Sequence, residues 1–186
     1  MPKKKVVGKK YVLDNQVGFM LRVATQFHTA IFTARMIDGL TPTQFATVAK
    51  LHDVGVCSQS DLGRTLVLDS ATVNGVTDRL YARGLINIVA DPNDRRRQWI
   101  SLSKKGVQTI EKAQAVAFEI SQETTAALTE AEHARLIHLL RKMIGTKASS
   151  RQEIRSAART KPNKPPLPPP MKRRDRPRLL RRASPE

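Results

Sequence analysis

Three consecutive arginines form the most distinctive chemical feature of this sequence. Arg95, Arg96 and Arg97 stand between two short apolar runs and directly follow Asp94. Guanidinium groups this close repel one another unless an anion lies beside them, and the minor groove of an A·T tract concentrates negative potential. A charge-assisted hydrogen bond from Arg96 to Asp94 would hold that guanidinium in one pose. The pattern predicts a turn that enters the minor groove of DNA; a solvated basic turn is the alternative.

A second candidate site is the helix predicted over residues 70–83. Apolar residues recur at helical spacing on one side, which leaves a small polar face outside. Short side chains allow a helix backbone to approach base edges in the major groove, where Asn74 can bond adenine bidentately and Ala71 can touch a thymine methyl. An ordinary solvated surface is the alternative. The residues of this helix expected to contact DNA are Ser70, Ala71, Thr72, Asn74, Gly75, Asp78 and Arg79.

Ser58, Gln59 and Ser60 open the helix that precedes this one. Exposed backbone amides, together with hydroxyl and amide side chains at a helix N-terminus, bind phosphate oxygens. We therefore expect these three residues to contact the DNA backbone. Ser58 can also cap its own helix, and the two roles are compatible.

A small-molecule site is expected in the cleft between the first long helix and the module formed by the DNA-binding helices and the hairpin. Arg22 could bind a carboxylate with two guanidinium nitrogens, and His28 could hydrogen-bond a ring substituent of an aromatic acid. Thr29 lies two turns beyond Arg22, and Phe32 adds an apolar wall. The alternatives are an ion pair between Arg22 and an acidic neighbour, and a purely structural His28.

Catalytic and metal chemistry are not expected. The sequence has no Gly-rich phosphate loop, no nucleophile elbow and no His-Glu-x-x-His pattern. None of its histidines form an i, i+4 pair, so neither a metal nor another cofactor is predicted. Cys57 is the only cysteine, so an intrachain disulfide is impossible and a redox-sensing role would lack a partner thiol. We expect a protein of the reducing cytoplasm that is not an enzyme.

Capping residues and changes of hydrophobic period predict the elements that hold these residues. The apolar spacing over residues 12–38 predicts one continuous helix with apolar side chains on two faces. One of these faces would pack against a second subunit. The alternative is a single long helix of the core. A period of two predicts a hairpin around the turn at 91–97. The other predicted elements are helices over about 42–54, 59–67, 70–83, 104–127 and 130–145, and strands over 85–90 and 98–102.

The net charge of +17 is spread unevenly over the 186 residues. Residues 147–186 hold 13 basic and 3 acidic side chains and eight of the eleven prolines, with too little apolar content to offset the entropy of ordering. The predicted division is a basic flexible arm at 1–11, a compact domain at 12–146 and a disordered basic tail at 147–186. Nucleic acid is the polyanion that this charge favours. No apolar run approaches the ~20 residues of a membrane span, so no membrane partner is expected.

Three stretches of the sequence, which begin at Leu40, Ser70 and Asp91, resemble the MarR family of bacterial winged helix-turn-helix regulators. The resemblance covers about residues 12–146, and Asp94 and Arg96 form its most specific part. Residues 11–19 and 26–32 further resemble a branch that controls the catabolism of aromatic or N-heteroaromatic acids, including nicotinate. The stretches that carry the family resemblance are 40–44 (LTPTQ), 70–85 with its Asp78-Arg79-Leu80 and Gly84-Leu85, and 91–96 followed by Leu102-Ser103.

The resemblance implies a mainly α-helical winged helix-turn-helix fold with a two-stranded β wing. Residues 41–103 would form the DNA-binding module, and 12–40 and 104–146 the dimerisation helices. It also implies an obligate homodimer on a pseudo-palindromic double-stranded operator, with Arg96 in the minor groove and Asp94 orienting it. In many members a small aromatic acid releases the DNA.

The function expected from the sequence is therefore a homodimeric transcriptional repressor released by a small aromatic acid and acting on the nucleoid. One alternative is a ligand-independent architectural DNA-binding protein dominated by its basic tail. A second alternative is a constitutive regulator without any ligand.

Overall fold

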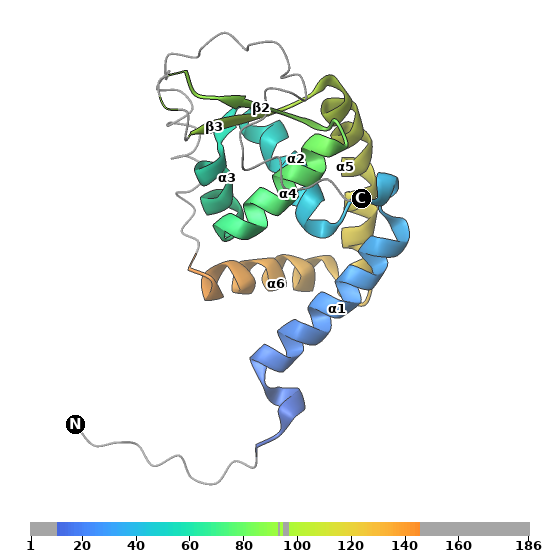
Figure 1. The fold of residues 1–186 in the computed structure, drawn as a ribbon. Helices are drawn as coiled ribbons and strands as arrows, with labels where there is room; N and C mark the ends of the chain where they lie inside the picture. The colour runs from blue at the N-terminus through green and yellow to red at the C-terminus, as the bar shows by residue number, and fades with distance from the viewer. Residues whose placement is uncertain (1–10, 93, 95–96, 146–186) are drawn as a thin grey trace, which may run out of the picture.

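The computed structural model describes residues 11–92, 94 and 97–145. Residues 147–186 and all but the last residue of the predicted arm lie outside the described residues. Figure 1 shows the helices of residues 42–82 beneath a hairpin, and the helices over 17–35 and 130–143 on the side that faces away from it. The elements are η1 (Leu13–Asn15), α1 (Val17–Arg35), η2 (Ile37–Gly39), α2 (Pro42–Val54), β1 (Cys57–Ser58), α3 (Gln59–Leu66), α4 (Ser70–Ala82), β2 (Ile86–Ala90), β3 (Gln98–Leu102), α5 (Lys104–Thr124) and α6 (Glu130–Met143).

The helices α2 to α6 begin at the polar capping residues that the sequence predicts. Thr41 at α2 and Thr129 at α6 each form a capping box with the residue three positions on. Ser58, Asp69 and Ser103 each accept a hydrogen bond from a backbone N–H in the first turn of α3, α4 and α5. These bonds satisfy donors that have no partner inside the helix. The helix-turn-helix order is therefore confirmed.

A two-residue strand that was not predicted joins the hairpin. β1 pairs antiparallel with β3, so the strand order is β1-β3-β2, and Ser58 lies opposite Trp99. The hairpin itself is confirmed, with Ile88 opposite Ile100. The two-stranded wing was predicted correctly, and the short third strand beside it was missed. Two residues are too few to show an alternating period, and the capping pattern at Ser58 indicates only the helix that follows.

The prediction of one continuous helix over 12–38 was wrong at both ends. Gln16 and Met36 have extended backbone angles, which separate α1 from the short turns η1 and η2. Asp38 then adopts a left-handed conformation with φ +54°. The break after α1 lets Met36 and Leu40 enter the core. Burial of two large apolar side chains outweighs the helical periodicity of the segment.

A close backbone contact sets where α5 meets the sheet. The backbone N–H of Ser103 donates to the carbonyl oxygen of Leu85 at 3.0 Å. A Cβ added at Gly106 would lie 2.0 Å from the same oxygen, so only glycine permits this approach. α5 ends at Thr124, three residues short of the predicted end at 127.

The core joins the three central helices to the sheet, α1 and α5, and leaves much of α1 and α6 uncovered. Val48, Leu80, Ile100 and Ile110 are completely buried. Phe32 is the one buried residue of α1, and α6 has none; both helices lie wholly within the described residues. The large apolar side chains exposed on the two helices are Val17, Met20, Leu21, Val23 and Phe27 on α1, and Leu136, Leu139 and Met143 on α6.

Candidate DNA interface and effector site

The recognition surface predicted on α4 is exposed at its small polar residues. Ser70, Ala71, Asn74 and Arg79 are exposed, whereas Leu80 and the two valines of the helix are buried. This arrangement follows from the helical spacing of the apolar residues. The exposed face has the short side chains that a helix needs in order to approach base edges.

Three other predicted contacts on α4 are half-buried. Thr72 donates its hydroxyl and its backbone N–H to the carboxylate of Asp69, both at 2.8 Å, and these bonds hold the pKa of Asp69 below its ordinary value. Asp78 turns one carboxylate oxygen into the protein. The guanidinium of Arg79 lies beside Gly75, where an added Cβ would be 3.5 Å from Nη1. Thr72 therefore donates to Asp69, the capping residue of α4, and shows less of its surface than expected.

The three residues that open α3 differ in exposure. Ser58 is only 1% exposed; its hydroxyl accepts from the backbone N–H of Asp61 at 3.2 Å and donates to the Asp61 carboxylate at 2.6 Å. Its side chain is thus engaged in capping, which was the alternative reading of this residue. Ser60 is exposed, and Gln59 is half-buried and contacts α4.

Arg64 is an exposed cation on α3 that the sequence analysis did not select. Its side chain pairs with Asp61 and remains 79% exposed. Burial acts to raise the pKa of Asp61, but hydrogen bonds from Ser58 and Arg64 and the charges of Arg64 and Arg97 lower it below its ordinary value. The i, i+3 spacing of Asp61 and Arg64 next to the three selected residues was the available signal.

The base of the wing is held by its single tryptophan. The indole N–H of Trp99 donates to Asp91 at 2.9 Å, and the guanidinium of Arg97 lies 4.4 Å from the centre of the Trp99 ring. The backbone N–H of Arg97 also donates to the carbonyl oxygen of Asp94 at 2.9 Å. Arg97 is therefore stacked at the root of the wing.

The tip of the wing is described only in part. Asp94 is exposed. Arg95 and Arg96 lie outside the described residues, and so does the predicted hydrogen bond between Arg96 and Asp94. The minor-groove contacts of Arg95 and Arg96 and the orienting role of Asp94 therefore stay predictions.

The four residues predicted to bind an effector lie on two sides of α1. Arg22 donates to Gln26 at 2.9 Å and lies over the ring of Phe19. On the other side, His28 shares a hydrogen bond of 2.9 Å with the hydroxyl of Thr124 on α5. Phe32 is buried and packs edge-on against a phenylalanine of α2.

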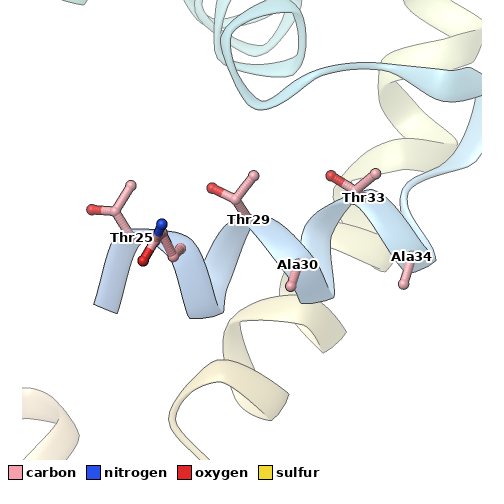
Figure 2. A pocket seen from close by; sticks show the side chains of 6 residues that line it. Thr25, Thr29, Ala30, Thr33 and Ala34 are labelled. Atoms are coloured by element: carbon pink, nitrogen blue, oxygen red, sulfur yellow. The ribbon is translucent and has the colours of Figure 1, made fainter. Parts of the chain in front are cut away.

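Thr29 lines an open hollow of about 600 Å³ whose lining residues all belong to α1, and not to both sides of the expected cleft. Figure 2 shows Thr25, Thr29 and Thr33 pointing to one side of the helix, and Ala30 and Ala34 to the other. Gln26, the partner of Arg22, completes the lining. The structure thus brings Thr29 and the neighbour of Arg22 together, and it places His28 and Phe32 elsewhere.

In the described part of the chain, no three His, Cys, Asp or Glu side chains are grouped so as to hold a metal ion. No helix within residues 11–92 and 97–145 is long and apolar enough to cross a membrane.

Comparison with known proteins identifies the relatives of this chain. A family model described as the MarR family matches residues 40–97. The helix-turn-helix transcriptional repressor NicR of Pseudomonas putida is 38% identical over 135 residues, which cover 72% of this chain and 85% of that protein. The chain belongs to the MarR family. MarR-family regulators act as dimers on operator DNA, and this chain is accordingly a DNA-binding transcriptional regulator.

Solved structures agree with membership of the MarR family. A probable transcriptional regulator from Pseudomonas aeruginosa is 43% identical, with a TM-score of 0.69 over 71% of this chain and 99% of that one. BpsR of Bordetella bronchiseptica, whose DNA binding is regulated by 6-hydroxynicotinic acid, is 38% identical, with a TM-score of 0.70 over 75% and 100% of the two chains. The mainly helical winged helix fold expected of a MarR regulator is confirmed.

Proposed function

We propose that this MarR-family chain is a homodimeric repressor whose operator binding is relieved by a hydroxylated N-heteroaromatic acid of the nicotinate type. The relationship to NicR, a repressor, and to BpsR, which responds to 6-hydroxynicotinic acid, supports the proposal. The exposed small polar face of α4, set on a capped helix-turn-helix, is the observation on which the mode of DNA binding rests.

The proposed complex places α4 in a major groove and the wing in the adjacent minor groove. Ser70, Ala71 and Asn74 would approach base edges, and Arg79 a phosphate. Ser60 and Arg64 at α3 would contact further phosphates. Arg95 and Arg96 at the tip of the wing would enter the minor groove, with Asp94 orienting Arg96. Arg97, which was also predicted to enter it, would instead stay stacked on Trp99 at the root of the wing. Two copies would engage half-sites about one helical turn apart.

The uncovered faces of α1 and α6 are the proposed dimer interface. α6 is amphipathic and has no buried residue, so its apolar side needs a second chain. Leu139→Glu would place a charge in that interface and should give a species near the 20.8 kDa of one chain in light scattering. Leu139→Met, which keeps the apolar volume, should stay dimeric. A dimeric Leu139→Glu protein would contradict this placement.

The hollow beside α1 is the proposed effector site. Arg22 would bind the carboxylate, and Thr29 with its neighbouring threonines would supply hydroxyl groups to the ring substituents. His28 and Phe32 would set the position of α1 through their contacts with α5 and α2. Arg22→Ala should weaken the binding of 6-hydroxynicotinate about tenfold or more, whereas Lys112→Ala, which removes another exposed cation, should not.

A selection of bound fragments from random duplex DNA tests the regulatory function. A repressor should select a palindromic site and prefer it over random duplex by ~10³-fold or more. Adding 6-hydroxynicotinate should dissociate that complex and raise the melting temperature of the free protein. A preference of only a few-fold would indicate a DNA-coating protein, and a selected site without any response to aromatic acids would indicate a constitutive regulator.

The relatives of this chain are transcriptional regulators, and we propose that it has no catalytic activity and acts on the nucleoid in the cytoplasm. A fluorescent fusion should coincide with stained DNA in the cell. A diffuse or peripheral signal would contradict this location.

A further inference from the structure

A side-chain contact joins the start of α3 to the exposed face of α4. The amide nitrogen Nε2 of Gln59 lies 2.5 Å from the Oδ1 of Asn74 and 3.3 Å from the hydroxyl oxygen of Thr77. Asn74 is exposed and central on the face proposed to read DNA, whereas Thr77 is buried beneath it. The orientation of the Asn74 amide therefore depends on a residue of another helix.

The buried hydroxyl of Thr77 decides which way the Gln59 amide is turned. Thr77 donates its only proton to a backbone carbonyl of α4, with Val73 O at 2.9 Å and Asn74 O at 3.0 Å. Its oxygen can then only accept a hydrogen bond from Gln59, so the N–H side of the Gln59 amide must face α4. Because the Gln59 amide turns its N–H side toward Asn74, the Asn74 group beside it must be the carbonyl and not the amino group.

We propose that Gln59 is a positioning residue that makes Asn74 a hydrogen-bond donor to DNA. With Oδ1 held by Gln59, Nδ2 is the atom of Asn74 that is left for a base edge. Bidentate bonding of adenine, expected from the sequence, needs both atoms on the base. A donor alone favours guanine, which presents two acceptors in the major groove and no donor. This inference rests on the proposed placement of α4 in the major groove.

Reversal of the donor at position 59 tests the inference. Gln59→Glu replaces the amide by a carboxylate, which accepts from Nδ2 of Asn74 and so turns Oδ1 toward the DNA. The base position read by Asn74 is identified as the one whose preference disappears in Asn74→Ala. At that position the wild-type protein should prefer guanine by about fivefold or more, and Gln59→Glu should move the preference to a base with a donor, cytosine or adenine.

The measurement is the relative affinity for four operators that differ only at that base pair. Ser60→Glu adds the same negative charge one residue away. It should weaken binding to all four operators alike and keep the guanine preference. Gln59→Ala should reduce the preference to about twofold or less. In the Asn74→Ala background the same substitution should have no further effect on it, because the two residues act as one unit.

The possible outcomes separate this inference from the function on which it rests. Failure of the wild-type protein to select any site would overturn both. Selection of a site at which Gln59→Glu and Gln59→Ala keep the wild-type base preference would overturn the role of Gln59 alone. Far-UV circular dichroism and melting temperature show that the variants are folded, so a loss of structure is not mistaken for a loss of positioning.

Discussion

Cys57 lies in β1, directly before the DNA-binding helices, and burial raises the pKa of its thiol to about 11, with a smaller contribution from the charge of Asp61. The folded protein therefore keeps the thiol protonated where an unfolded chain has begun to lose the proton. A thiol held in this form reacts slowly with oxidants and alkylating agents. This microenvironment agrees with a structural role for Cys57.

The Cys57 thiol should reduce stability at alkaline pH. Between about pH 9 and pH 11 the unfolded state binds fewer protons than the folded state, so the free energy of unfolding falls as pH rises. Denaturation by urea should show that Cys57→Ala removes up to about 2 kcal/mol of this fall relative to the wild-type protein. Equal alkylation rates for the folded and the urea-unfolded chain near neutral pH would contradict the shift.

Val67 should carry backbone strain in the turn between α3 and α4. It has φ +54° and its side chain is 90% exposed, so a β-branched residue occupies a left-handed conformation without any packing in return. Val67→Asn should raise the free energy of unfolding by about 1 kcal/mol, since asparagine tolerates this conformation. Val67→Thr keeps the branch and should leave stability unchanged. Equal stability of the two variants would show that the turn is not strained.

Among the elements, α4 is joined by one arginine to η2, the short turn that follows α1. Arg83, the C-cap of α4, donates to the backbone carbonyl of Asp38 in η2 and lies 3.4 Å from the Oε1 of Gln44 in α2. η2 directly follows the helix that carries the proposed effector site. A movement of α1 therefore has a direct polar route to the recognition helix.

Arg83→Met should weaken the coupling between effector and operator. Methionine keeps an apolar stem but cannot make either hydrogen bond, so the effector-dependent loss of operator affinity, typically 5–150-fold in such systems, should shrink to about twofold. Arg83→Lys can reach only one acceptor at a time and should be intermediate. The measurement is operator affinity with and without 6-hydroxynicotinate. Full coupling in Arg83→Met would exclude this route.

For the whole molecule, the basic segment 147–186 should add affinity for DNA of any sequence. It lies outside the described residues, and its 13 basic side chains can displace counterions from phosphates. Deleting it should weaken binding to operator and random duplex alike and flatten the plot of log affinity against log salt. A glycine-serine tail of the same length is the control. An unchanged slope after deletion would contradict this role.

Local chemistry along the chain was sufficient to predict the helix starts and the wing hairpin. Thr41, Ser58 and Asp69 cap helices by bonds to residues within three positions, so their effect is visible without any tertiary contact. The small polar face of α4 could be predicted for the same reason, since helical spacing alone separates Asn74 from the buried valines.

Contacts between segments that are far apart in the sequence determine the features that could not be predicted. The pairing of β1 with β3, the break at Met36 and the close approach at Gly106 each depend on a partner far away in the chain. The covering of His28 and Phe32 on one side of α1 depends on α5 and α2 in the same way. Gln59 and Asn74 are in contact because α3 packs against α4. A hydrogen bond between residues 15 positions apart produces no periodic pattern in the sequence from which it could be predicted.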